Sequence, residues 1–502
     1  MKIARIAALT SIVTGAALLA GCASPSGTAA PDDTLDIALS DAIDSWNPQE
    51  ALASASFSVF PQVFGALLDT SPDGSELEPG VATEYEFDDA ALTITFHLDP
   101  EAKFSDGADV TPEDVIYSEG LWAAGALYGS YFASIDAVTS PDEDTVVFAL
   151  NRPDHSLLGI LATTNAAIVP ADLGGTDPEE FWKKPISTGA YAIESEEVGE
   201  SIVLTSNPHY TTHEDRPATV KYSVVEDGAQ QLLQFQSGEI DVVNQVELSS
   251  ASQFDQALLQ STESSGVSTL MFQTAVAPFD DPNFRKAVAL AINYDDLLVG
   301  GYADLATQAD TVLPQTIPGV APCATCAWAS RDIDEAKRLV EESSYDGSDI
   351  TLYVKSGAGA DQLAAQALVP MLAEAGITVT VEPMALSSYV EKLGAGDFQM
   401  GVLTYNALAP SAVDPLGFLA VTGVLFTQSD PAAANTALDA LTSSKDDTET
   451  EAATAIFEDW AFANTPVVPL AVPDAIYAVS SHVKGFTPNH YRSWSVKNVT
   501  LE

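Results

Sequence analysis

The segment between residues 350 and 381 restricts the fold more than any other part of the chain. Ile350–Val354 reads as a strand, Asp361–Ala375 as a helix, and Gly376 is placed to end that helix. A second strand, Ile377–Val381, follows directly. Two strands joined by a helix of this length form a right-handed parallel unit. The sequence therefore predicts an α/β protein, with a further strand at Phe398–Leu403.

The chain is too long for one lobe. A single hydrophobic core stops growing at about 250–300 residues, so a chain of 502 residues is expected to form two or more lobes. In the first half, Thr93–Leu98 alternates as a strand. Thr111, followed by Pro112 and Asp114, has the pattern of a helix start.

The N-terminus has the pattern of a secretory signal. Two basic residues precede an apolar, small-residue stretch at residues 6–19, and the string Leu-Ala-Gly-Cys ends at Cys22. That string resembles a bacterial lipobox, in which the cysteine is diacylated, and two acyl chains anchor a protein stably. We expect a lipoprotein signal peptide at residues 1–21 and a flexible tether at residues 22–33, with the lipid anchor on Cys22 at the extracytoplasmic face of the cell membrane. The alternative is an ordinary cleaved signal peptide in which Cys22 is incidental.

The composition excludes some partners. The formal net charge is −53, and nucleic acid binding needs a basic surface. Charge-driven adsorption to anionic lipid is disfavoured for the same reason. The acidic surface is expected to keep the protein soluble, to tolerate salt, or to steer cationic ligands.

Two cysteines remain after Cys22. Cys323 and Cys326 lie in a Pro-rich segment, and outside the cytoplasm a local disulfide is expected. A zinc site would need further ligands, and no second Cys pair or nearby His pair supplies them, so we expect no metal. A redox-active pair is the other alternative.

Short motifs in a fixed order resemble one known family. They include an alternating strand before a Lys-Phe-Ser-Asp-Gly turn and a Thr-Pro-Glu-Asp helix start. The matching segments are Leu77–Ala82, Leu92–Leu98, Lys103–Gly107, Thr111–Val115, Thr188–Tyr191, Asn207–Tyr210, Gly238–Val242 and Phe284–Ile292. In this order they resemble the bacterial extracellular solute-binding proteins of the oligopeptide, dipeptide and nickel type, which are substrate-binding lipoproteins of ABC transporters.

That resemblance implies a two-lobed periplasmic-binding-protein-like fold of type II, with an extra subdomain in the first lobe. Lobe I is then expected to combine residues 34–68, 187–272 and 474–502. The subdomain would occupy residues 69–186, and lobe II residues 273–473. The lobes would close around a ligand by hinge motion, and the protein is expected to be a monomer.

The resemblance also suggests where the ligand lies. By family position, the substrate-binding residues are Trp46, Asn47, Tyr128, Thr164, Asn165, Gln245, Tyr405, Asn406, Ser411 and Asp414. In peptide-binding relatives, an Asp three residues before an Asp-Pro pair binds the ligand's α-amine, and Ser411 takes that place before Asp414 here. A neutral Ser cannot supply the charge-assisted bond that an ammonium favours. Ordinary packing is the alternative for Trp46, Tyr405 and Asn406.

No catalytic motif appears. The chain has no P-loop string and no Gly-x-Ser-x-Gly elbow, so we expect neither an ATPase nor an enzyme, and no cofactor. The sequence predicts a protein that captures a short peptide or peptide-like solute and delivers it to an ABC permease driven by a separate ATPase. The alternatives are a binder of a metal chelate, sugar or opine-like compound, a secreted enzyme on the same scaffold, and a membrane-tethered sensor or chaperone. An Arg that the nickel branch places near Thr164 and Asn165 is missing, which makes nickel uptake a weaker reading.

Overall fold

The computed structural model describes residues 33–210, 215–323, 325–328, 330–356, 359–417, 432–491 and 494–502. The predicted signal peptide, Cys22 and nearly all of the predicted tether lie outside these residues. Every helix and strand named below belongs to the unit Thr34–Glu502.

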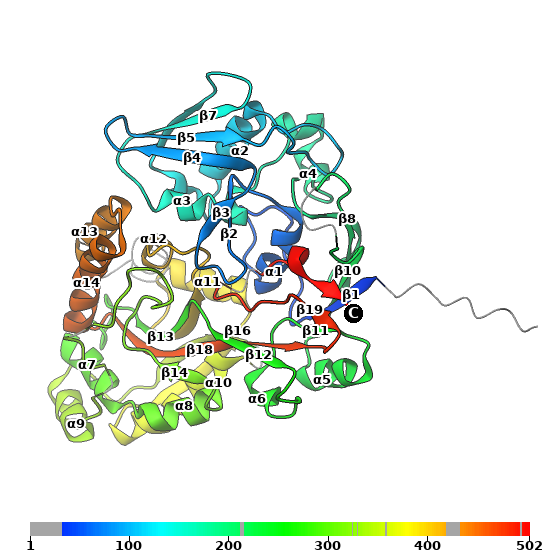
Figure 1. The fold of residues 1–502 in the computed structure, drawn as a ribbon. Helices are drawn as coiled ribbons and strands as arrows, with labels where there is room; N and C mark the ends of the chain where they lie inside the picture. Colours follow the sequence, from blue (N-terminus) through cyan, green and yellow to red (C-terminus); the bar gives the residue numbers. More distant parts are fainter. Residues whose placement is uncertain are drawn as a thin grey trace, which may run out of the picture. The chain divides into compact units, whose positions relative to one another are not determined.

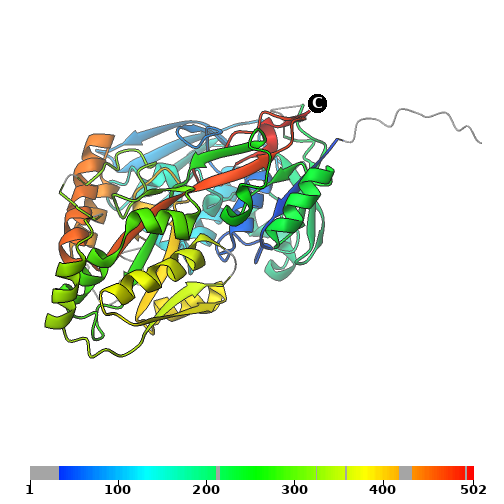
Figure 2. The same cartoon turned by 90° about the horizontal axis from the view of Figure 1, so that it is seen from below.

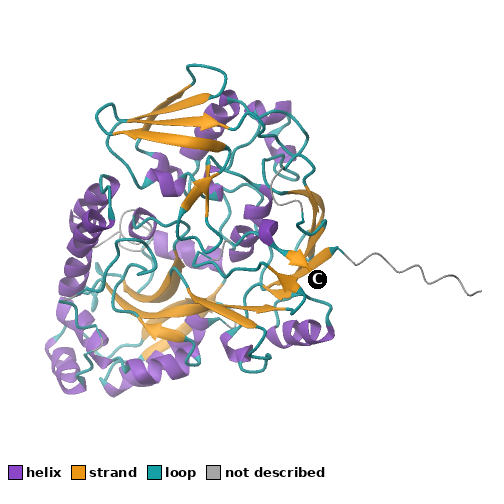
Figure 3. Cartoon of the chain, viewed as in Figure 1, coloured by secondary structure: helices purple, strands orange, loops and turns teal. Residues whose placement is uncertain are grey.

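A large mixed sheet organises the described part of the chain (Figures 1 and 3). Its strands, in spatial order, are β16 (Val379–Met384), β15 (Ile350–Lys355), β17 (Met400–Asn406), β13 (Gly266–Phe272), β18 (Val467–Val479), β11 (Val242–Val243), β1 (Thr34–Leu39), β10 (Thr219–Val224), β9 (Ser201–Ser206) and β8 (Tyr191–Glu197). Strands β12 (Leu259–Glu263) and β14 (Ala306–Gln308) also pair with β18. The α/β class is confirmed, because β15 pairs in parallel with both β16 and β17, and β1 in parallel with β10 and β11.

Strand β18 lies in the middle of this sheet and joins its two halves (Figure 2). Its first half, Val467–Pro473, pairs with β13 and β14, and its second half, Asp474–Val479, pairs with β12 and β11. The change of partner falls between Pro473 and Asp474. Separate apolar cores lie on either side of this point, so β18 is the element that joins them.

A second sheet forms a part of its own at the top of Figure 1. Its order is β4 (Ala82–Asp88), β5 (Thr93–Leu98), β7 (Thr145–Leu150) and β6 (Ile135–Thr139). Residues 82–160, from β4 to α3 (Leu157–Ile160), are called the four-strand subdomain below. The short pairs β2 (Leu68–Thr70) with β3 (Leu77–Pro79), and β19 (Val483–Lys484) with β20 (Thr500–Leu501), complete the described strands.

Helices cover the sheets, and short polar side chains begin many of them. The α-helices other than α3 are α1 (Ser54–Val63), α2 (Pro112–Ala124), α4 (Pro178–Phe181), α5 (Gly228–Ser237), α6 (Leu248–Ala251), α7 (Pro282–Ala291), α8 (Tyr294–Tyr302), α9 (Ile333–Glu342), α10 (Ala360–Glu374), α11 (Leu386–Gly394), α12 (Val413–Leu416), α13 (Ala432–Thr442) and α14 (Asp447–Asn464). The 3-10 turns are η1 (Gly129–Phe132), η2 (Thr164–Ala166), η3 (Ala171–Gly175) and η5 (Val496–Asn498). Carboxylate caps such as Asp281 on α7 and Asp446 on α14 show that part of the acidic composition satisfies helix N-termini. None of the helices in the described ranges combines the length and the apolar character needed to cross a membrane.

The predicted strand–helix–strand unit is present, with its second strand displaced. Helix α10 lies within one residue of its predicted bounds. Strand β16 begins at Val379, not at Ile377, because Val379 is the residue that pairs with Ile350 at the start of β15. The amide of Ile377 instead donates to the carbonyl of Leu372 and closes the end of α10.

Candidate functional site

The loop that follows β17 is docked on the four-strand subdomain. Residues 407–417, called the β17 loop, place Leu408 and Ala409 in the apolar core of the subdomain. Ser411 is only 6 % exposed, and a Cβ atom placed on Gly159 of α3 would lie 3.6 Å from the Cβ of Ser411. The predicted ligand-binding loop therefore contacts a sheet that lies far from it in sequence.

Asp414 occupies the centre of this contact. Its side chain is 0 % exposed, and Oδ1 accepts a hydrogen bond from the hydroxyl of Tyr131 at 2.7 Å. The hydroxyl of Tyr405 also donates to Oδ1, and the backbone amide of Leu408 donates to Oδ2. Burial raises the pKa of Asp414, and these three donors oppose that rise. Burial and the nearby carboxylate also raise the pKa of both tyrosines.

Tyr128 lies beside Tyr131 in the same contact region. Its hydroxyl donates to the carbonyl of Ala51 at 2.8 Å. Its ring meets Phe57 edge-on with 6.4 Å between ring centroids, and it lies 5.9 Å from the ring of Tyr131. Tyr128 thus ties the turn before α1 to the four-strand subdomain.

The turn before α1 holds Trp46 and Asn47. The indole Nε1 of Trp46 donates to Glu196 at 2.7 Å, and its ring packs 6.1 Å from that of Phe60. Asn47 accepts the amide of Gln49 at 3.1 Å, which closes the turn. In the structure both side chains support the local fold, which is the packing alternative for Trp46.

A cavity of about 300 Å³ lies beside these elements. Thr164 and Asn165 line it, together with the apolar residues Phe57 on α1, Phe64 directly after α1, and Leu408 of the β17 loop. Two of the ten predicted residues, Thr164 and Asn165, therefore face the cavity. The other eight surround it or lie elsewhere in the fold.

Asn165 is the most informative residue of the cavity. It is 2 % exposed, and its carbonyl accepts a hydrogen bond from the side chain of Gln49 at 2.6 Å. Its Nδ2 has no hydrogen-bond partner among the described residues, and neither has the buried Oγ1 of Thr188 in the same lining. Unpaired buried polar groups cost free energy, so a ligand that accepts hydrogen bonds would satisfy them.

Gln245 and Asn406 lie at strand ends of the large sheet. Gln245 is half-buried and follows Asn244, whose side chain bonds Ser58 at 2.9 Å and Trp494 at 2.6 Å. Asn406 pairs with Gly266 at the end of β17. Sequence reasoning did not name Trp494. Family position suggests the segment Tyr128–Phe132, which contains Tyr131, but of that segment only Tyr128 is singled out as a binding residue.

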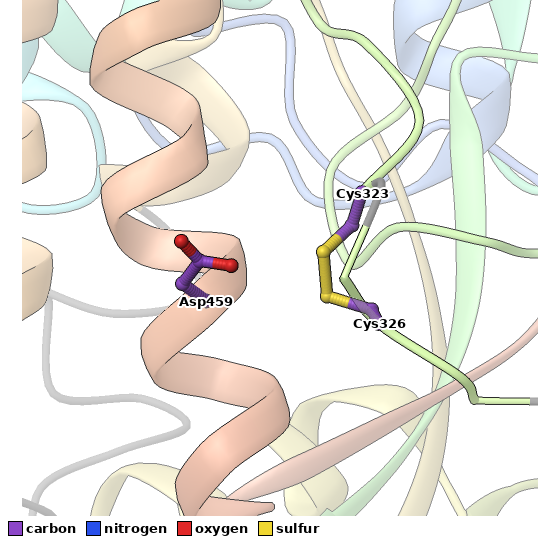
Figure 4. A group of neighbouring side chains, drawn as sticks. All are labelled: Cys323, Cys326 and Asp459. Carbon is purple, nitrogen blue, oxygen red and sulfur yellow. A yellow bond between two sulfur atoms is a disulfide. The ribbon is translucent and has the colours of Figure 1, made fainter.

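A disulfide joins Cys323 and Cys326, and Asp459 of α14 faces the pair (Figure 4). Among the described residues, these three form the one group whose ligand atoms are close enough together to hold a metal. Because the sulfurs are bonded to each other, they are not thiolate ligands here. The hydroxyl of Thr325 donates to Asp459 at 2.6 Å and anchors the loop to α14.

Comparisons with known proteins agree with this architecture. The chain is 24 % identical over 402 residues to the probable D,D-dipeptide-binding periplasmic protein DdpA of Escherichia coli K12, covering 78 % of this chain and 76 % of the relative. Haemophilus influenzae OppA in complex with the peptide RPPGFSPFR superimposes with a TM-score of 0.83 at 19 % identity, over 94 % of this chain and 99 % of the other. AgaA of A. tumefaciens R10 in complex with agropinic acid gives a TM-score of 0.80 at 23 % identity, over 93 % and 99 %.

These likenesses confirm the predicted two-lobed binding-protein fold. Residues 76–423 match the model of the bacterial extracellular solute-binding proteins, family 5. The matched region contains the four-strand subdomain, the β17 loop, Thr164 and Asn165. The chain therefore belongs to the family 5 bacterial extracellular solute-binding proteins.

Proposed function

We propose that the protein captures a short peptide or peptide-like solute and delivers it to an ABC permease powered by a separate ATPase. The cavity beside the β17 loop carries this proposal. Its volume of about 300 Å³ falls at the lower end of the range of small-molecule sites, roughly 300–1,000 Å³. DdpA, as named, and OppA, as solved, are peptide binders, which favours a peptide over the agropinic acid of AgaA.

The chemistry of the cavity suits a peptide. The amide Nδ2 of Asn165 is an unpaired donor, and a peptide backbone offers carbonyl acceptors. Phe57, Phe64 and Leu408 supply apolar contacts for side chains. Across the lining, Lys497 pairs with Asp69, so this lysine is already neutralised.

The predicted site residues take two roles in this proposal. Thr164 and Asn165 contact the solute directly. The others do not line the cavity; they belong to the turn before α1, the four-strand subdomain, the strand ends of the large sheet or the β17 loop. This second set consists of Trp46, Asn47, Tyr128, Gln245, Tyr405, Asn406 and Ser411, with Asp414 treated separately below.

Thermal-shift screening with a short-peptide library tests the proposal. A bound peptide at 100 times its Kd should stabilise the protein by about 2.7 kcal/mol. N165A should weaken the binding of that peptide, whereas N283A, a matched substitution at the exposed N-terminus of α7, should leave the affinity for the peptide unchanged. A clear shift with opines, sugars, chelates or haem but none with any peptide would exclude a peptide solute.

The remaining parts of the proposal concern location and partners. The protein acts as a monomer without turning over its solute, and diacylation of Cys22 anchors it at the outer face of the membrane. The protein from cells that express C22A should carry no acyl chains, whereas mass spectrometry of wild-type protein should show acyl chains on Cys22. Recovery of the wild-type chain without lipid would contradict the anchor. Mass spectrometry of a peptide after incubation should show it intact.

A further inference from the structure

The carboxylate of Asp414 is one hydrogen bond away from the cavity without lining it. Its Oδ2 accepts the backbone amide of Leu408, and the side chain of Leu408 is part of the cavity wall. Asp414 itself is 0 % exposed and is not among the lining residues. A solute in the cavity therefore meets Leu408, and Asp414 stands behind it.

Both oxygens of Asp414 are already engaged. Oδ1 accepts from Tyr131 and Tyr405, and Oδ2 accepts from the amide of Leu408. A buried carboxylate is tolerated only where donors of this kind surround it. The arrangement matches a structural charge and leaves no open side for a ligand's ammonium group.

The donors come from separate parts of the fold. Tyr131 lies in η1 of the four-strand subdomain, 283 residues before Asp414 in sequence. Tyr405 lies in β17 of the large sheet, and Leu408 is the second residue of the β17 loop. Asp414 thus fastens the loop to the sheet it leaves and to the subdomain on which it is docked.

A second junction supports the same contact. Asp89 of the subdomain pairs with His155 at 2.8 Å and also with Lys445, which lies between α13 and α14. The backbone amide of His155 donates to the carbonyl of Thr442 at 2.8 Å. The subdomain is therefore held at two places, and the Asp414 junction is the one that reaches the cavity.

We propose that Asp414 is a positioning residue: through Tyr131 and Leu408 it holds the β17 loop in the arrangement that binds solute, without touching the solute. This inference rests on the proposed function for its binding measurements. It departs from the sequence-based expectation that Asp414 contacts the substrate. It also makes Tyr131 a determinant of affinity although Tyr131 lies outside the cavity lining.

A double-mutant cycle tests the inference. D414N keeps the shape of the side chain but turns an amide donor toward the backbone N–H group of Leu408 or the tyrosine hydroxyls, and Y131F removes a single hydroxyl. Each variant should lower the fraction of protein in the arrangement that binds solute, and the apparent Kd rises by the inverse of that fraction, so a fraction of about 10 % raises the Kd of a peptide found in the screen roughly tenfold. The double variant should lose far less than the product of the two effects, since both remove the same bond.

Y128F is the matched control. It also removes one buried tyrosine hydroxyl, but that hydroxyl bonds Ala51 and not Asp414. Its effect on Kd should multiply with that of D414N. If D414N abolishes binding of peptides with a free amino group but spares their N-acetylated forms, while Y131F leaves Kd unchanged, Asp414 contacts the solute and the inference is wrong.

Hydrogen exchange on the unliganded protein provides a readout that needs no solute. The β17 loop, residues 407–417, should exchange faster in D414N and in Y131F than in the wild type, while β5 should be unchanged. Exchange in the loop that is the same in all three proteins would overturn the inference. Y131F and Y405F keep this measurement possible if D414N does not fold. If no peptide binds, the proposed function fails, and the exchange result still decides the role of Asp414.

Discussion

Glu458 of α14 is a buried carboxyl group without a basic partner among the described residues, and its titration should be visible in the stability of the protein. Only 2 % of its surface is exposed. Its oxygens accept the backbone amides of Val312 at 2.9 and 3.1 Å and of Leu313 at 3.0 Å. Burial raises the pKa of Glu458 from 4.5 to about 7, against the effect of the two amides, and the charge of Asp459 adds to the rise.

The sign of the effect follows from this direction. The folded protein prefers the protonated acid, so the stabilisation is complete below the unfolded pKa of 4.5 and is lost as the pH rises through about 7. At about 1.4 kcal/mol per pKa unit, the full loss is about 3 kcal/mol. Between pH 5 and pH 8, the part lost is about 2.5 kcal/mol, because some ionisation in the unfolded chain has occurred by pH 5.

E458Q isolates this contribution, since glutamine imitates the protonated acid and does not titrate. Urea unfolding at pH 5 and pH 8 gives the free energy of unfolding of both proteins. From pH 5 to pH 8, the free energy of unfolding of E458Q relative to that of the wild type should rise by about 2.5 kcal/mol. E451Q, the same substitution on the exposed face of α14, controls for the loss of one negative charge and should show little change. A difference between wild type and E458Q that is equal at pH 5 and pH 8 would refute the reasoning.

Three further sites test packing elsewhere. G189A places a Cβ atom 2.4 Å from the backbone carbonyl of Val63 and should lower the free energy of unfolding by about 2 kcal/mol in urea titrations. The guanidinium of Arg285 donates to three backbone carbonyls at the end of α14 and before α7; R285A should cost about 3 kcal/mol, and R285K less, by the same assay. Reducing the Cys323–Cys326 disulfide opens the small loop that it closes in the unfolded chain and should lower the free energy of unfolding by about 2 kcal/mol. The wild type should then have a lower Tm in a dithiol reductant, and the Tm of the double Ser variant should not respond to the reductant.

Local patterns in the sequence predicted the elements well, because each depends on residues close in the chain. Thr93–Leu98 forms β5 with the predicted bounds. Thr111 begins α2, and its amide is bonded by Asp114 at 2.8 Å as the capping pattern requires. The start of β16 was placed two residues early, because a strand's first paired residue depends on its neighbour, β15, and not on its own alternation.

The roles of site residues were harder to predict, because their partners are distant in sequence. Trp46 is an aromatic residue of the kind that lines ligand sites, but its indole N–H donates to Glu196, 150 residues away in sequence. No local pattern connects such residues. Asn165 was placed beside the cavity by its position in the family, and its unpaired Nδ2 could be recognised only once its neighbours were known.

In the β17 loop, the position of a residue in the family does not determine its role in this chain. Ser411, which the family resemblance aligns with the acid that binds the ligand's amine in peptide-binding relatives, is buried against Gly159. The acid of the same loop, Asp414, already accepts hydrogen bonds from Tyr131, from Tyr405 and from the amide of Leu408. Neither residue offers a free charge to the cavity. In the proposed function the loop therefore contributes shape through Leu408, and polar recognition falls to other lining groups such as Asn165. A solute recognised in this way is selected by its hydrogen-bond acceptors and its apolar surface more than by a terminal ammonium.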